Sequence, residues 1–287
     1  MGLENLINYC NNMYSNADTK HRCRDCNNDC KGSCEDCLEL IHFGNNRRYN
    51  CKNIINYYVC KYSYKYLSEI GNIFYRQNFI NEREKLNIIS IGCGPCTDLM
   101  GIKQYIENND LTITLKYLGI DLNENWKDIH KFIKSDFKEE DIDFIYDDVF
   151  NVFNKEDNIG NYDILFLQYL ISDMIKYNDN DSMNTFIDNL VEKIISHMPV
   201  GSLIIINDIN LQDVRIYFEL ILKKMSEKNF EYKYERLHFD NYARPTHYHY
   251  GSEYCDNDLI CNIPVEIQEK YNPWMFCSSS QLIIKRR

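Results

Sequence analysis

A glycine-rich turn between an apolar strand and a helix constrains the fold of this chain more than any other feature. Residues 88–91 form a short apolar run typical of a buried strand, and residues 98–106 have the pattern of a helix. The turn between them has the sequence Gly92-Cys93-Gly94-Pro95-Cys96-Thr97. Glycines let the backbone come close to a ligand, and the first turn of a helix offers N–H groups without intrahelical partners. The turn therefore predicts a ligand site in an α/β fold.

Strands and helices alternate along the rest of the chain. The predicted strands are residues 88–91, 113–120, 143–146, 162–167, 202–207, 231–239 and 280–285. The predicted helices are residues 98–106, 183–197 and 214–228, with residues 54–79 before the turn. Strict alternation implies a mostly parallel sheet covered by helices on both faces, and the two late strands suggest an antiparallel end. We predict a Rossmann-like, mostly parallel seven-stranded sheet.

Five segments in the expected order resemble the motifs of class I methyltransferases that depend on S-adenosylmethionine. The sequences I-G-C-G-P-C-T-D-L at 91–99 and Y-L-G-I-D at 117–121 are similar to the first two motifs. Residues 147–150, 162–168 and 198–204 resemble the third, fourth and fifth. The resemblance implies that the chain binds S-adenosylmethionine and transfers its methyl group.

The resemblance also implies which residues contact the cofactor. Asp121 ends the strand whose tip binds both ribose hydroxyls in Rossmann-like folds. Asp148 aligns with the acidic residue that contacts the adenine amino group, although a turn-capping role remains the alternative for Asp121. The expected cofactor-binding residues are Gly92, Cys93, Gly94, Pro95, Asp98, Asp121, Leu122, Asp148, Val149 and Gln168.

The chain departs from the family pattern at two positions. Ser90 stands where the family usually carries an acidic residue linked to the amino group of the cofactor, and Cys96 replaces a third glycine. Asp98 is our candidate for the missing negative charge. The departures keep open a second interpretation, a catalytically inactive regulatory protein that binds S-adenosylmethionine or another nucleoside. NAD is less expected, because Thr97 occupies the last glycine position of G-x-G-x-x-G.

Methyl transfer to N, O or S depends mainly on holding the acceptor in line with the methyl group. The candidates for this positioning are Gln168, Tyr169, Ser172 and Asp173, just past the fourth strand, and each has a helix cap or a core contact as its alternative. No N-P-P-Y run of the nucleic-acid amino-methyltransferases is present. In the loop 244–250, His247 and His249 are candidates for a base or for ligands, or are surface histidines.

A dense block of cysteines precedes the turn. Two C-x2-C pairs, Cys23/Cys26 and Cys34/Cys37, have the spacing that places two thiolates on one zinc ion. We expect one or two structural Zn²⁺ ions, and the candidate ligands are His21, Cys23, Cys26, Cys30, Cys34, Cys37, His42 and Cys51. Cys10 and Cys60 are expected to be core thiols. We expect no metal at Cys93 and Cys96, because the backbone there is needed for the cofactor.

Two other interpretations concern the same block. Cys30-x3-Cys34-x2-Cys37 matches the spacing of an iron–sulfur cluster in radical enzymes, but those enzymes place it after a barrel strand. Residues 20–85 carry 12 Lys and Arg against 8 Asp and Glu, which favours nucleic acid, although two Zn(Cys)₄ centres would cancel that excess. The expected methyl acceptor is RNA or protein.

Composition and charge complete the predicted organisation. The chain divides near residue 86 into a Cys-rich zinc-binding and helical module (1–85) and a methyltransferase domain (86–287). The net charge of the whole chain is −11, and residues 86–287, with 20 Lys and Arg against 33 Asp and Glu, account for −13. The sequence has no secretory signal and no apolar run of membrane-spanning length, so we expect a soluble cytoplasmic protein. In the helix 54–79, the tyrosine-rich stripe predicts a core-facing side, with a base-stacking surface or a lid as alternatives.

Overall fold

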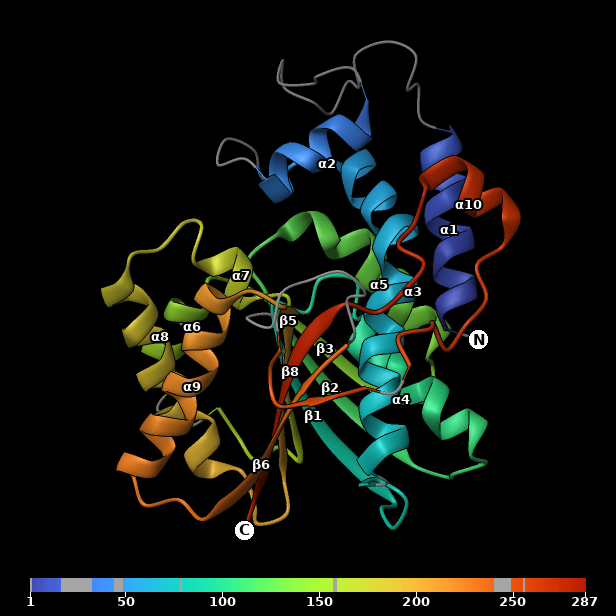
Figure 1. The fold of residues 1–287 in the computed structure, drawn as a ribbon. Coiled ribbons are helices and arrows are strands. Elements are labelled where there is room, and N and C mark those ends of the chain that lie inside the picture. The colour runs from blue at the N-terminus through green and yellow to red at the C-terminus, as the bar shows by residue number, and fades with distance from the viewer. Residues whose placement is uncertain are drawn as a thin grey trace.

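The structure, a computed structural model, describes residues 2–16, 33–43, 49–77, 79–156, 159–239, 249–254 and 256–287 (Figure 1). The strands are β1 (Lys85–Ile91), β2 (Thr114–Asp121), β3 (Asp141–Tyr146), β4 (Ile164–Gln168), β5 (Leu203–Ile209), β6 (Tyr232–His238), β7 (Ser252–Glu253) and β8 (Ser279–Arg286). The helices are α1 (Leu3–Asn16), α2 (Cys34–Phe43), α3 (Lys52–Gln77), α4 (Thr97–Asn108), α5 (Lys127–Asp136), α6 (Val149–Lys155), α7 (Ile171–Met174), α8 (Asn180–Lys193), α9 (Gln212–Glu227) and α10 (Val265–Tyr271). Two 3₁₀ turns, η1 (Glu124–Trp126) and η2 (Ile195–His197), complete the described elements.

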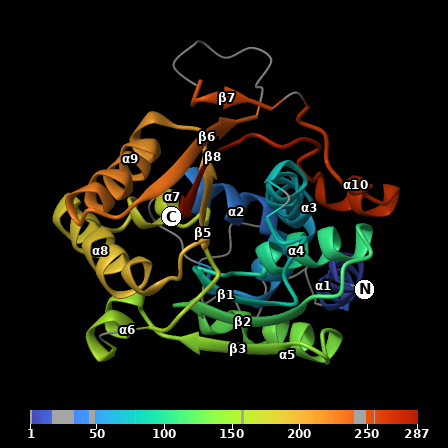
Figure 2. The same ribbon diagram turned by 90° about the horizontal axis from the view of Figure 1, so that it is seen from below.

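One sheet runs through the molecule in the order β3-β2-β1-β4-β5-β8-β6-β7 (Figure 2). Strands β1 to β5 pair in parallel, whereas β8 is antiparallel to both β5 and β6. The order reverses between β1 and β4, since both neighbours of β1 follow it in the chain. In open α/β sheets, ligands bind outside the carboxyl ends of the strands at such a switch point. The fold is therefore Rossmann-like and defines one edge for a ligand.

The central strands are apolar on both faces because helices cover both. Ile88 and Phe166 belong to one cluster of buried side chains, and their chain neighbours Ile89 and Leu165 belong to the other. Helices α1 to α5 and α10 lie on the first face, and α6 to α9 lie on the second (Figures 1 and 2). This alternation is the pattern expected for strands buried on both sides.

The predicted α/β architecture is confirmed, and its strands and helices occur in the predicted order. Two details differ. The sheet has eight strands among the described residues instead of seven, because the two-residue β7 pairs with the edge of β6. Helices α1, α2, α5, α6, α7 and α10 were not expected from the sequence. Side chains of α1 and α3 share a continuous core with the sheet, and the division into two domains at residue 86 stays a prediction.

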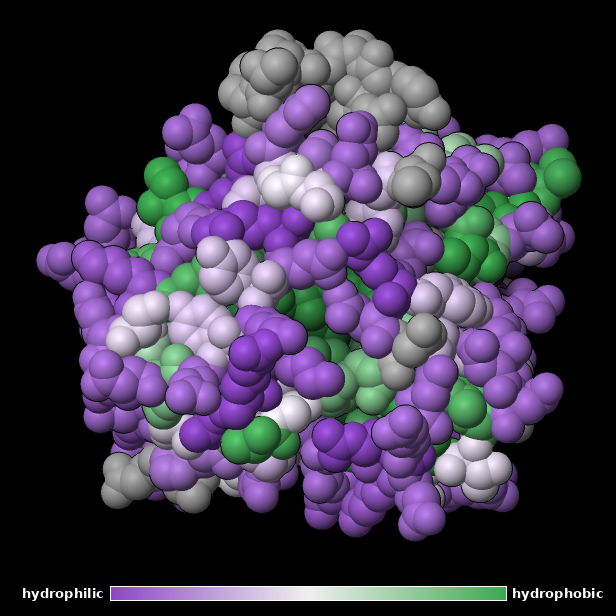
Figure 3. Space-filling view, turned by 60° about the horizontal axis from the view of Figure 1, so that its bottom comes forward, coloured by the Kyte–Doolittle hydropathy of each residue, from purple (hydrophilic) through white to green (hydrophobic). Residues whose placement is uncertain are grey.

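The parallel strands begin at the end of the sheet that is opposite the carboxyl edge with the switch point. The surface at this end is mainly hydrophilic (Figure 3). Figure 3 shows hydrophobic residues at the base of a depression there, surrounded by hydrophilic ones. None of the helices in the described ranges is long and apolar enough to cross a membrane.

The close crossing of α3 and α4 depends on Gly101. A Cβ atom at this position would lie 3.0 Å from the carbonyl oxygen of Leu67 and 3.1 Å from Cβ of Ile70. Alanine in a helix is ordinarily about 1 kcal/mol better than glycine, but overpacking two helices costs about 1–3 kcal/mol. We expect Gly101→Ala to lower the free energy of unfolding, measured by urea denaturation. Asn184→Ala, on the exposed face of α8, should instead raise it by roughly 0.5 kcal/mol. A gain in both variants would contradict the close packing.

Candidate active site

The glycine-rich turn lies at the carboxyl end of β1, beside the switch point. Gly92 and Gly94 have φ values of 68° and 46°, a region that favours glycine. The N–H of Gly92 donates to the carbonyl of Ile120 at 2.7 Å, which joins the turn to the end of β2. Cys96, in place of the family's third glycine, precedes α4 with a φ of 58°, so it accepts a left-handed backbone without being glycine.

Asp121 at the tip of β2 is connected directly to this turn. Its carboxylate accepts the N–H of Gly94 at 2.8 Å and the N–H of Asn123 at 2.8 Å. Burial raises the pKa of Asp121, while these two N–H groups act to lower it. A carboxylate has about four lone-pair positions, so two backbone donors leave it able to accept two hydroxyls. The adjacent Leu122 is 62% exposed and offers an apolar surface at the same edge.

Asp98 and Ser90 are neighbours in the core beneath the turn. The carboxylate of Asp98 accepts the hydroxyl of Tyr117 at 3.1 Å and the N–H of Leu99 at 2.8 Å. Burial raises the pKa of Asp98, and the nearby Ser90 hydroxyl acts against that shift. A buried carboxyl group thus stands next to the position where the family usually carries an acidic residue.

The end of β3 supplies the third part of the edge. Asp148 is the cap of α6, and its side chain accepts the N–H of Phe150 at 2.9 Å. Asp147 faces Asn151 and Lys155 instead, at 2.9 Å and 2.5 Å. Val149 follows as the first residue of α6. Because β3 is parallel to β2, with Tyr146 opposite Asp121, these residues share the carboxyl edge with Asp121.

Gln168 lies at the end of β4, beside the switch point. Its Oε1 accepts the hydroxyl of Thr97, the first residue of α4, at 2.8 Å. Its Nε2 donates to the backbone carbonyl of Tyr66 on α3 at 2.8 Å. Both ends of the amide are therefore engaged, and Gln168 fixes α3 and α4 relative to β4.

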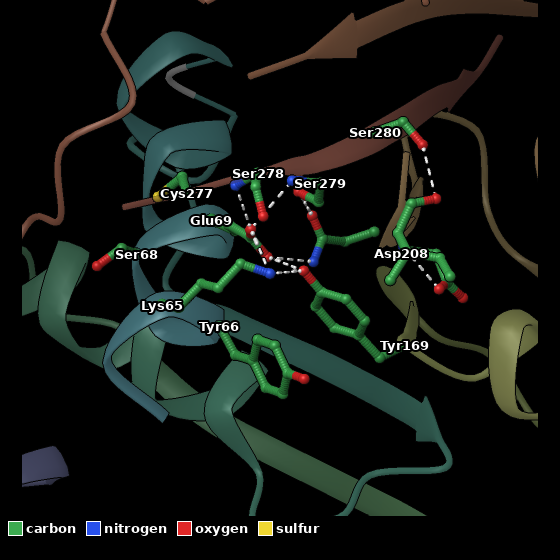
Figure 4. Close-up of polar contacts among 12 residues, drawn as sticks. Lys65, Tyr66, Ser68, Glu69, Tyr169, Asp208, Cys277, Ser278, Ser279 and Ser280 are labelled. Carbon is green, nitrogen blue, oxygen red and sulfur yellow. Dashed lines mark hydrogen bonds and ion pairs between the residues drawn. The ribbon is translucent and has the colours of Figure 1, made fainter. Parts of the chain in front are cut away.

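Tyr169 belongs to a buried polar network between α3 and the sheet (Figure 4). Its hydroxyl donates to the carboxylate of Glu69 at 2.9 Å and accepts from the ammonium of Lys65. Glu69 is fully buried and also accepts the N–H groups of Ser278 and Ser279 at 2.9 Å and 3.1 Å. Burial and the Glu69 charge raise the pKa of Tyr169. Its phenol is therefore neutral near pH 7 and has its donor and acceptor positions filled.

The segment after Tyr169 is held by the end of β5. Ser172 is buried, and its N–H donates to the carboxylate of Asp208 at 3.0 Å. Burial raises the pKa of Asp208 to about 6. Asp173 is 41% exposed and lies 3.8 Å from Lys176. Of the four candidates for positioning, Ser172 is thus a core contact through its backbone, whereas the side chain of Asp173 reaches solvent.

An aromatic cluster from α3 lies beside this edge. The ring of Tyr66 stacks on Tyr169 with centroids 4.1 Å apart, and Tyr62 stacks on Tyr66 at 5.6 Å. Tyr58 meets Trp126, just after β2, at 5.9 Å. The stripe faces the core, as the core interpretation predicts. It packs against Trp126 after β2 and against Tyr169 after β4.

The predicted zinc block lies partly outside the described residues, which exclude His21, Cys23, Cys26 and Cys30. Cys34, Cys37 and Cys51 are buried at the ends of α2 and α3. Burial lowers the pKa of His42 to about 4, and its ring nitrogens lie 3.1 Å from the hydroxyl of Tyr49 and 3.3 Å from that of Tyr62. The zinc site stays a prediction. Within the described ranges, one group of three metal-ligating side chains converges, and it consists of Cys93, Cys96 and His130.

The other sequence alternatives give a mixed outcome. His247 lies outside the described residues, and His249 is exposed, with its ring stacked on His238 at 5.1 Å. Cys10 and Cys60 are fully buried, as expected for core thiols. The described strands form an open sheet and not a barrel, and residues 17–32, which include Cys30, lie outside the described residues.

Comparisons with known proteins give similarity in structure only. No protein-family model and no curated protein sequence matches the chain. Precorrin-6y C5,15-methyltransferase from Geobacter metallireducens is 9% identical, with a TM-score of 0.43, over 76% of this chain and 88% of that one. A putative class I S-adenosylmethionine-dependent methyltransferase from Listeria monocytogenes is 12% identical, with a TM-score of 0.44, over 76% and 59%. A methyltransferase from Pyrococcus furiosus is 11% identical, with a TM-score of 0.40, over 74% and 81%.

The polar partners around Tyr169 were not predicted from the sequence. Lys65 and Glu69 are separated by four residues on the tyrosine-rich helix, which is the spacing of a helical ion pair. That spacing was the available signal, but it is equally common on solvated helix faces. Nothing in the local sequence indicated that Asn207 would donate to the same carboxylate at 3.0 Å.

Removing the charge of Glu69 should destabilise the fold strongly. In Glu69→Gln the buried Lys65, 3.3 Å away and with a side chain only 7% exposed, loses its counter-charge. Breaking a buried pair costs about 3–5 kcal/mol, so we expect a loss of this size in urea denaturation. The matched variant Asp141→Asn breaks the pair with Lys116, whose members are 59% and 53% exposed, and should cost less than about 1 kcal/mol. Equal losses would refute the network's role.

Asp208 should give the stability a recognisable pH dependence. Its folded pKa of about 6 exceeds the ordinary value of 3.8, so the folded state holds this proton more tightly than the unfolded chain. The resulting stabilisation is complete below about pH 4 and is lost as the pH rises to about 6, by roughly 2–3 kcal/mol. Asp208→Asn should lack this component. Urea denaturation across this range should show the stability difference between the two proteins changing with pH, and a constant difference would exclude the effect.

Proposed function

We propose that the chain binds S-adenosylmethionine across the carboxyl ends of β1, β2 and β3 and transfers its methyl group. The observation that carries the proposal is the pairing of the glycine-rich turn with Asp121 through the N–H of Gly94, at 2.8 Å. This pairing puts a carboxylate, a close-approach backbone and the start of α4 at one switch point.

Each part of the edge has a role in this proposal. Asp121 accepts the ribose hydroxyls, and the exposed Leu122 covers one face of the adenine. Asp148 keeps one carboxylate oxygen for the adenine amino group while the other caps α6. The turn at Gly92–Pro95 lies along the methionine part. Asp98 supplies negative charge beneath it in place of an acidic residue at Ser90.

S-adenosylmethionine supplies an electrophilic methyl group on a sulfonium. The chain's contribution is to hold the acceptor in line with that group, which can account for about 7–11 kcal/mol of the barrier. Gln168 fixes the floor of the site through Thr97 and Tyr66. Tyr169 is held by Glu69 and Lys65 and acts as a wall of the site. Because its phenol is neutral and fully engaged, the acceptor atom must arrive as a neutral or deprotonated nucleophile.

For the acceptor we propose a macromolecule, RNA or protein, as the sequence analysis suggests. Three consecutive apolar side chains are exposed near Lys65: Trp274, Met275 and Phe276 are 38%, 51% and 40% exposed. The Lys65 ammonium lies 5.5 Å from the Trp274 ring, so this surface is continuous with the buried network. We propose that it contacts the acceptor. The cysteine block before residue 52 is proposed to bind structural zinc that stabilises the adjoining helices.

Cofactor binding should depend on Asp121. A hydrogen bond to a charged group contributes about 1.5–3 kcal/mol, so Asp121→Asn should weaken binding of S-adenosylmethionine roughly 10- to 150-fold in calorimetry. Asp141→Asn, at the opposite end of β3, should bind as tightly as the unaltered chain. No heat of binding at about 1 mM, for either S-adenosylmethionine or its demethylated product, would refute the proposal.

Transfer and binding must be tested separately. Incubation with methyl-labelled cofactor and fractionated cell extract should place label on a protein or an RNA. Tight cofactor binding without label on any fraction would instead support the alternative, a regulatory binding protein.

A further inference from the structure

Two thiols and an imidazole converge beneath the glycine-rich turn. Cys93 and Cys96 come from the turn itself, and His130 comes from α5. The metal-ligating atoms of all three lie within 4.8 Å of one another, and all three residues are buried. Methyl transfer as proposed above uses none of these side chains.

The spacing is close to that of a filled zinc site. With Zn–S of about 2.3 Å and Zn–N of about 2.0–2.1 Å, a tetrahedron separates sulfur from nitrogen by about 3.5 Å. Cys93 Sγ lies 3.9 Å from His130 Nε2, so a shift of a few tenths of an ångström completes the geometry. The C-x2-C spacing of the two cysteines is the one that places two thiolates on a single ion.

The imidazole is already oriented for ligation. Its Nδ1 lies 2.9 Å from the hydroxyl of Tyr146, and its ring stacks on Phe144 with centroids 3.9 Å apart. A fixed partner on the second ring nitrogen is the usual support of a metal-bound histidine. His130 Nε2, which faces the thiols, now lies 2.6 Å from the carbonyl oxygen of Gly94 and would exchange that contact for the metal.

The net charge of the filled site favours Zn²⁺ in this buried position. Two thiolates and a neutral imidazole on Zn²⁺ have a net charge of zero, so the filled site buries no net charge. Nitrogen and sulfur donors together select zinc over magnesium or calcium. The sulfur of Cys93 also points toward β2, since a Cβ at Gly119 would lie 2.7 Å from it. The ion would therefore lie on the core side of the turn.

We propose that Cys93, Cys96 and His130 bind one Zn²⁺ ion beneath the cofactor turn. This reverses the expectation from the sequence that no metal binds at Cys93 and Cys96. Three protein ligands leave a fourth position for water. The ion joins the turn between β1 and α4 to α5, and so fixes the backbone that faces the cofactor. This site is separate from the cysteine block before residue 52.

The test is the zinc content of the full chain, purified after expression with added Zn²⁺ and measured by mass spectrometry of the metal. The double variant Cys93→Ser/Cys96→Ser should contain one zinc ion fewer than the unaltered chain. Cys10→Ser/Cys60→Ser removes two other fully buried thiols and should lose none. This difference excludes zinc held elsewhere as the cause. Equal zinc contents in the two double variants would overturn the proposal.

A second measurement needs no folded variant. Crystals of the unaltered chain, measured at the zinc absorption edge, should show an anomalous peak within about 2.3 Å of both sulfurs and about 2.1 Å of His130 Nε2. No peak there, or a disulfide between Cys93 and Cys96 in its place, would overturn the proposal.

Discussion

The buried carboxylate of Glu69 joins helix α3 to three separate segments of the sheet. It accepts from Tyr169 after β4, from Asn207 on β5 and from the backbone at the start of β8, and it pairs with Lys65 on its own helix. A carboxylate without such partners would cost several kcal/mol to bury, so the network is stable only when all of its members are in place. The network therefore holds helix α3 in place against the sheet.

That position determines the shape of the candidate site. With α3 fixed, the carbonyl of Tyr66 receives Gln168, and the ring of Tyr66 covers Tyr169. Tyr169 has a φ of 53°, a left-handed backbone that is uncommon for a tyrosine and that directs its side chain toward α3. Strain of about 1–3 kcal/mol at such a residue is offset by its two charged hydrogen-bond partners. Helix α3, which precedes all of the strands in the chain, therefore positions Gln168 and Tyr169 at the candidate site.

The parts of the fold that could be predicted are those encoded by short-range pattern. Central strands such as β1 and β4 are continuous apolar runs, and the turn at Gly92 and the tip at Asp121 have local signatures. Helix α5 was not predicted because it spans only 10 residues and carries three apolar ones, Ile129, Phe132 and Ile133. His130, Lys65 and Glu69 depend on contacts between distant segments. In the sequence, these three residues cannot be distinguished from ordinary solvated or core side chains. They meet their partners only when the fold brings distant segments together.

The two positions at which the turn differs from the methyltransferase motif that it resembles have different physical consequences. Where the methyltransferase motif has an acidic residue on its first strand, β1 carries Ser90, and the nearby carboxylate is that of Asp98 on α4, which accepts the Tyr117 hydroxyl and a backbone N–H. Cys96, by contrast, introduces a side chain where glycine would have none, and this side chain points into the core beside Cys93 and His130. The backbone conformation of the turn is preserved at a cost of about 1–2 kcal/mol for a left-handed residue. What the substitution adds is a thiol on the inner side of the turn, which leaves the outer side free to meet a ligand.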